Sequence, residues 1–203
     1  MGRGRLEAFS DGVIAVAITL LALDLAIAGP GHGTSLLHQL QDHWPSFIAY
    51  VISFFTIGII WVNHHDLVKN IAVVNRTILF LNVMLVLFVV AIPFATSTMA
   101  KYLTSDNQDA NVAMAIYCLT FEGMALSFAA IFSWTLGEGH SLHPLPKEAR
   151  RSAWLGFSIG SLIYIVAVAV AFINAPAALA IIGVVAVYCI FQRTPAVRSP
   201  QPD

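Results

Sequence analysis

Polar side chains occur in two long apolar segments of the sequence, where they could do chemistry. Ser10 and Asp11 lie near the start of the first segment, and residues 63–66 (Asn-His-His-Asp) end the second. A carboxylate beside an imidazole can fix a hydrogen bond, relay a proton or bind a metal ion. Adjacent histidines project about 100° apart on a helix, whereas zinc ligands on one helix favour a spacing of four residues. The spacing therefore favours a structural hydrogen-bond network over a metal site.

Two further polar residues lie deep in apolar segments. Asn82 is a lone amide in the third segment, and Glu122 is the deepest acid in the fourth. A polar group is costly in hydrocarbon, so each needs a partner, a cavity or a role. Glu122 could carry a proton, or it could be a hydrogen-bonded structural acid.

The composition identifies the environment in which these side chains lie. Hydrophobic residues make up 58% of the 203-residue chain and charged residues only 10%, against about 25% charged residues in soluble proteins. These charges are too few to cover the surface of a soluble domain. The net charge of −1 argues against a nucleic-acid partner, because such proteins concentrate Lys and Arg on one face. We predict an integral membrane protein surrounded by lipid.

Six segments have the length and apolarity of membrane spans, for which roughly 20 residues are needed. Gly, Pro and polar clusters separate them. We expect an all-α bundle of six transmembrane helices at about residues 6–28, 45–66, 75–99, 110–136, 152–173 and 176–192. Residues 1–192 would form one transmembrane domain, and the proline-rich residues 193–203 a short disordered cytoplasmic tail.

The basic residues predict the orientation of the bundle. With a cytoplasmic N-terminus, only Lys101 of the ten basic residues faces outside. The other nine face the cytoplasm: Arg3, Arg5, Lys69, Arg76, Lys147, Arg150, Arg151, Arg193 and Arg198. This asymmetry follows the positive-inside rule. Six spans then place both termini in the cytoplasm.

The first helix carries a stripe of apolar side chains on one face. Ser10 and Asp11 project well away from this stripe, whereas Gly12 and Thr19 lie at its edge. The stripe consists of Phe9, Val13, Val16, Leu20, Leu23 and Ile27. Such a stripe can pack on neighbouring helices or line a pore, and periodicity alone favours packing.

Three short motifs follow one another in the first 100 residues. They are Arg5-x-x-x-Phe9-Ser10-Asp11-Gly12, Trp61-Val62-Asn63-His64-His65 and Ile92-Pro93-Phe94-Ala95-Thr96. Together they resemble the endolysosomal potassium-channel family, transmembrane protein 175, and its prokaryotic relatives. The rest of the chain resembles this family only in helix number and loop pattern.

The resemblance implies a channel in the plasma membrane of a prokaryote, built as a homotetramer with K⁺ as the permeant ion and no cofactor. The first helix of each subunit would line a central pore. Family members narrow the pore with an aliphatic ring seven positions after the motif Phe, and a threonine ring lies three positions further on. Here these are Val16 and Thr19, followed by Leu20 and Leu23. Valine is shorter than the usual Ile or Leu, so the narrowest ring could be any of the three aliphatic ones.

The resemblance also implies how such a pore selects ions. The chain has no Thr-Val-Gly-Tyr-Gly run, so a filter of backbone carbonyls is not available. An ion crossing an apolar ring sheds water, which costs less for K⁺ than for Na⁺, and a threonine ring can replace part of that water. We therefore expect modest selectivity for K⁺ over Na⁺.

The polar motif residues are implied to be structural. Arg5, Phe9, Ser10 and Asp11 would tie the first helix to its neighbours. Their expected partners in the second helix are Asn63, His64 and His65.

Two other function classes stay open. A proton-coupled secondary transporter would use Asp11, Asp24 or Glu122 as a relay, but matching broken helices in the two halves are missing. A membrane-embedded metalloenzyme would need His64, His65 and Asp66 to share one ion, which their adjacency disfavours. The sequence therefore predicts a channel, with neither an enzymatic activity nor a metal site.

Overall fold

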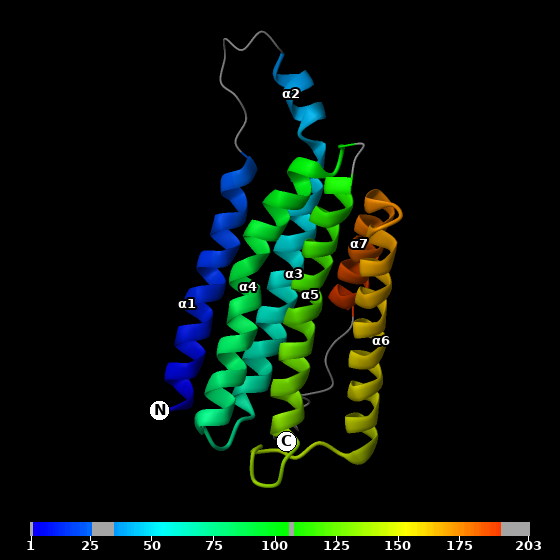
Figure 1. Ribbon diagram of the computed structural model, residues 1–203. Helices are drawn as coiled ribbons and strands as arrows, with labels where there is room; N and C mark the ends of the chain where they lie inside the picture. The colour runs from blue at the N-terminus through cyan, green and yellow to red at the C-terminus, as the bar shows by residue number, and fades with distance from the viewer. Residues whose placement is uncertain (1, 26–34, 106–107, 192–203) are drawn as a thin grey trace.

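Long helices that run alternately up and down form the bundle (Figure 1). The computed structural model describes residues 2–25, 35–105 and 108–191. The six long helices are α1 (Arg3–Leu21), α3 (Trp44–Lys69), α4 (Arg76–Tyr102), α5 (Gln108–Thr135), α6 (Lys147–Ala171) and α7 (Ala175–Phe191). The predicted all-α bundle of six long helices is confirmed. The predicted tail at 193–203 lies outside the described residues.

Four of these helices are each long and apolar enough to cross a membrane, namely α3, α4, α5 and α6. The helix α7 is strongly apolar but has only 17 residues. The helix α1 has 19 residues, or about 28 Å of rise, close to the thickness of the hydrocarbon core. Its first turns carry the charged residues Arg3, Arg5, Glu7 and Asp11, so its apolar part is shorter than the helix itself.

The first helix departs from its predicted range of 6–28. It begins at Arg3, and its α-helical part ends at Leu21. A 3₁₀ turn, η1 (Ala22–Leu25), follows, so Leu23 lies beyond the α-helix. The last carbonyls of a helix lack partners four residues on, and tighter 3₁₀ winding can satisfy them.

A short helix that the sequence did not predict, α2 (Leu36–Asp42), precedes α3. Ser35 caps it by accepting a hydrogen bond from the backbone N–H of His38 at 3.3 Å. With seven residues, it is too short to cross a membrane.

The helix α4 lies at the centre of the first half of the bundle. It packs against α1, α3 and α5, while α6 and α7 form a hairpin that packs on α5 and α3. The helix runs on through the buried Pro93 without ending. Because α1 contacts both α3 and α4, these two helices position the motif residues of α1.

Basic residues gather at one end of the bundle, where α1, α4 and α6 begin and α3 ends (Figure 1). Arg3, Lys69, Arg76 and Lys147 mark this end, and Lys101 lies near the opposite end of α4. We call the basic end the cytoplasmic end, following the positive-inside rule, and the other the outer end. Two loops are joined there, because the backbone N–H of Ala72 donates to the carbonyl of His140 at 2.9 Å.

Candidate pore helix and its polar network

The helix α1 has one buried and one exposed face. The buried residues are Leu6, Ser10, Ile14, Ala17 and Leu21. Their spacing of three or four residues places them on one side of the helix, against α3 and α4. The opposite side is exposed in the single subunit.

The residues predicted to line a pore all lie on this exposed side. Val16 is 56% exposed, Leu20 40% and Leu23 71%, and Thr19 is exposed as well. Large apolar side chains are exposed on α3, α4 and α6 as well, as expected for helices surrounded by lipid. On α1 the exposed row also carries the hydroxyl of Thr19, which fits a face that meets other subunits or a pore. That these residues form the constriction stays a prediction.

The hydroxyl of Thr19 is oriented by a hydrogen bond within α1. Oγ1 donates to the carbonyl of Val16 at 2.8 Å. Its proton is therefore turned inward to the helix, and the oxygen lone pairs remain available on the exposed side. An oxygen in this state can accept from water or coordinate a cation.

A buried hydrogen-bond network ties α1 to both neighbouring helices. The side-chain amide of Asn82 on α4 donates to Oγ of Ser10 at 2.9 Å, and Oδ1 of Asn82 accepts from Nε2 of His64 on α3 at 2.8 Å. All three side chains are buried. Buried polar groups are costly unless they are paired, so this network fixes the rotation of α1 against α3 and α4.

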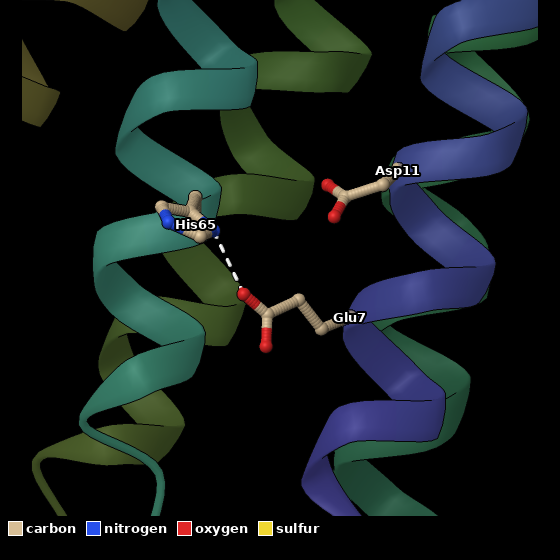
Figure 2. Close-up of side chains that lie close together, drawn as sticks. All are labelled: Glu7, Asp11 and His65. Atoms are coloured by element: carbon tan, nitrogen blue, oxygen red, sulfur yellow. Dashed lines mark ion pairs between the residues drawn. The ribbon is translucent and has the colours of Figure 1, made fainter.

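A second set of contacts joins α1 to α3 nearer the surface (Figure 2). Oε1 of Glu7 lies 2.8 Å from Nδ1 of His65, an ion pair when the imidazole is protonated. Oδ1 of Asp11 accepts from the indole N–H of Trp61 at 2.9 Å. The guanidinium of Arg3 donates to the carbonyl of Lys69 at 2.8 Å. The start of α1 is thus held to α3 over several turns.

The structure changes the partners that were expected from the sequence. His64 reaches Ser10 only through Asn82, and His65 pairs with Glu7. Asp11 was expected to pair with a histidine and instead binds Trp61. The reason is geometric, since adjacent residues on α3 face different neighbours.

Two predicted members of the network lie outside it. Arg5 and Phe9 are exposed, and within the described ranges no hydrogen bond or ion pair involves either side chain. They therefore do not join the network within one subunit. Asn63 is half-buried in the same turn of α3 as His64, so its role stays a prediction.

Sequence reasoning missed three members of the network, although each left a signal. Asn82 was noted only as a lone amide, and such a group in hydrocarbon requires a partner. Glu7 precedes Asp11 by one helical turn and so shares its face. Trp61 belongs to the motif that also contains His65.

Glu122 lies apart from α1, between α5 and α6. The hydroxyl of Ser161 donates to its Oε1, while Oε2 is buried without a hydrogen-bond partner in the described part of the chain. In Figure 1, α1 and α6 lie at opposite edges of the bundle. Asp11 and Glu122 therefore belong to separate environments.

The structure brings together a different set of potential metal ligands from the set considered in the sequence analysis. Among the described residues, Glu7, Asp11 and His65 place one ligand atom each within 4.8 Å of one another. His64 faces Asn82 instead. The triplet His64, His65 and Asp66 is thus not brought together as a metal site.

The chain is similar to known channel proteins over most of its length. The family model described as endosomal/lysosomal potassium channel TMEM175 matches residues 5–93. A potassium channel of Streptomyces collinus is 43% identical over 196 residues, which cover 95% of this chain and 93% of that relative.

A solved structure agrees with this relationship. The crystal structure of a lysosomal potassium-selective channel TMEM175 homolog from Chamaesiphon minutus matches with a TM-score of 0.82 at 30% identity, covering 93% of this chain and 96% of that one. The endosomal/lysosomal proton channel TMEM175 of Gallus gallus is 30% identical over 156 residues, which cover 72% of this chain and 31% of that protein. The chain therefore belongs to the TMEM175 family, a family of membrane ion channels and not of enzymes.

Proposed function

We propose that this protein is a plasma-membrane potassium channel with modest selectivity over sodium, in which four copies place α1 around a central pore. The observation that carries the proposal is the exposed face of α1, where an aliphatic row and a threonine lie opposite the buried network. A single subunit cannot enclose a pore with one helix, so several copies are needed. The potassium-channel names of two bacterial relatives support the choice of ion.

The exposed face suggests how ions are selected. Rings of Val16, Leu20 and Leu23 would form a narrow apolar passage that water wets poorly. Crossing it requires partial dehydration, which costs less for K⁺ than for Na⁺. Thr19 lies between Val16 and Leu20, and its inward-turned proton leaves oxygen lone pairs to replace lost water.

The polar network would keep these rings in place. The buried contacts of Ser10, Asn82 and His64 fix the rotation of α1 within each subunit. A rotation of one residue on a helix turns the side chains by about 100°. Without the network, Val16 and Thr19 could turn away from the pore axis. The network therefore affects the pore by fixing the rotation of α1.

The transporter alternative has less support from the geometry. A proton relay needs acids within hydrogen-bond reach of one another or of linking groups. Asp11 is held by Trp61 on α3, and Glu122 by Ser161 on α6. The helices α1 and α6 lie at opposite edges of the bundle (Figure 1). Asp24 lies in η1 at the far end of α1 from Asp11.

The proposal is tested by flux measurements on purified protein in liposomes, with K⁺ and Na⁺ compared in parallel. We expect a K⁺ preference in the wild type that falls in Thr19→Ala and Val16→Ala. Thr120→Ala is the matched control, because Thr120 makes the same kind of backbone hydrogen bond on α5, to Ile116 at 2.8 Å. A pH-sensitive dye inside the liposomes measures proton flux, since the chicken relative is named as a proton channel.

Two results would contradict the proposal. Flux indifferent to the changes at Val16 and Thr19 would place the ion path elsewhere. Saturable, pH-driven uptake without passive K⁺ flux would favour the transporter.

A further inference from the structure

Three potential metal ligands meet between α1 and α3 near the cytoplasmic end. Glu7 and Asp11 are four residues apart on α1, so their carboxylates lie on one face. Figure 2 shows both carboxylates extending toward His65 on α3. Their ligand atoms all lie within 4.8 Å of one another, and all three side chains are half-buried.

One nitrogen of the His65 imidazole is enclosed by the cluster. Its Nδ1 is shielded from solvent and has no hydrogen-bond partner among the described residues, although Oε1 of Glu7 is only 2.8 Å away. The two atoms are thus close without the alignment that a hydrogen bond requires. A shielded nitrogen beside two carboxylates is an arrangement that a bound cation satisfies, because each atom can direct a lone pair at it.

A neighbouring side chain orients two of the three ligands. The indole N–H of Trp61 donates to Oδ1 of Asp11 at 2.9 Å, and Oδ2 takes no part in this hydrogen bond. The Trp61 ring also stacks on His65 with a centroid distance of 6.1 Å. Metal ligands are commonly held by such supporting contacts, and losing one typically weakens metal binding by about 10–100-fold.

We propose that Glu7, Asp11 and His65 bind one first-row transition-metal ion of the Zn²⁺ class and thereby link α1 to α3. One imidazole nitrogen with two carboxylate oxygens suits zinc and its neighbours, whereas Mg²⁺ and Ca²⁺ prefer oxygen ligands alone. Neighbouring ligands of a tetrahedral zinc lie about 3.3 Å apart, so the side chains need to move by about 1.5 Å or less. Water would complete the coordination.

The site is independent of the proposed ion path. None of its three residues belongs to the aliphatic and threonine positions of α1, and zinc binding requires no channel activity. A metal that binds only the folded bundle stabilises it, in proportion to the logarithm of its concentration over its dissociation constant. The metal would bind Glu7 and His65 in place of their ion pair and so strengthen the contact between α1 and α3.

The test is zinc binding by the full-length protein, purified in detergent with a tag that contains no histidine. Equilibrium dialysis against ZnCl₂ should give one zinc per wild-type subunit. Glu7→Gln and His65→Ala should each weaken binding at least tenfold, and Trp61→Phe about tenfold. His143→Ala and Asp66→Asn are matched controls that remove an imidazole or a carboxylate outside the site, and they should bind like the wild type.

Two further measurements do not depend on the variants folding. Zinc at 100 times its dissociation constant should raise the melting temperature of the wild type by about 5 °C. Zinc-edge X-ray absorption on the wild type should show a single imidazole with oxygen ligands. No zinc binding by the wild type, unchanged binding by folded Glu7→Gln and His65→Ala, or a site with sulfur or several imidazoles would overturn the proposal.

Discussion

The two halves of α1 differ in how they are held. In the cytoplasmic half, Glu7, Ser10 and Asp11 each contact a polar group on another helix. In the outer half, the hydroxyl of Thr19 donates to the carbonyl of Val16 on its own helix, and Val16 is mostly exposed. The cytoplasmic half carries the polar motif residues and is fixed by directional contacts to other helices. The outer half is mainly apolar, and its described residues show no such contact.

The two halves of α1 therefore have different roles: the cytoplasmic half anchors the helix, and the outer half exposes side chains to other subunits and ions. A hydrogen bond in hydrocarbon is specific in direction, so the pairing of Ser10 with Asn82 sets both the height and the rotation of α1. Apolar contacts are less directional. The cytoplasmic half can therefore hold the helix in register, while the outer half keeps a whole face free for other subunits and ions.

The largest effect is expected from breaking the anchor at its centre. Asn82→Ala removes the shared partner of Ser10 and His64 and leaves both buried without it, which should destabilise the protein by about 2 kcal/mol. The melting temperature of the purified protein, followed with size-exclusion chromatography, measures this loss. Unchanged stability and assembly in Asn82→Ala would contradict the anchoring role.

A smaller effect, on K⁺ flux and not on stability, is expected from a substitution in the outer half of α1. Leu20→Ser makes the proposed apolar ring easier to wet, and a barrier lowered by about 1.4 kcal/mol would raise K⁺ flux about tenfold. Liposome flux measures it. The matched control is Leu162→Ser, which changes an exposed leucine on α6 at the far edge of the bundle and should leave flux unchanged. An equal rise of K⁺ flux in both variants would contradict the proposal that Leu20 forms an apolar ring in the pore.

The smallest change in stability is expected at Thr19. Thr19→Val keeps the shape and removes only a hydroxyl bonded within α1, so stability should change by less than about 0.5 kcal/mol. The K⁺ preference should nevertheless fall, because the oxygen is lost. Melting curves and paired K⁺ and Na⁺ flux measure the two quantities, and a large loss of stability would show that Thr19 is part of the anchor.

Much of the fold could be predicted because it follows from composition and charge. Apolar length predicted the six long helices. Arg3, Lys69, Arg76 and Lys147, which were expected on one side of the membrane, do lie at one end of the bundle. Periodicity also predicted that Val16, Thr19 and Leu20 lie on a different face of the helix from Ser10. In the structure these three residues are exposed and Ser10 is buried. Helix ends were less accurate, and α2 was missed, because a seven-residue helix has no span-length signal.

The pairing of the polar residues was decided by tertiary structure alone. The sequence determines on which face of its own helix a residue lies, since the helical repeat is fixed. It does not determine the height and rotation of the neighbouring helix, which depend on packing along the whole length of both. For this reason Asp11 binds Trp61, His65 meets Glu7, and Asn82 becomes the link between α1 and α3.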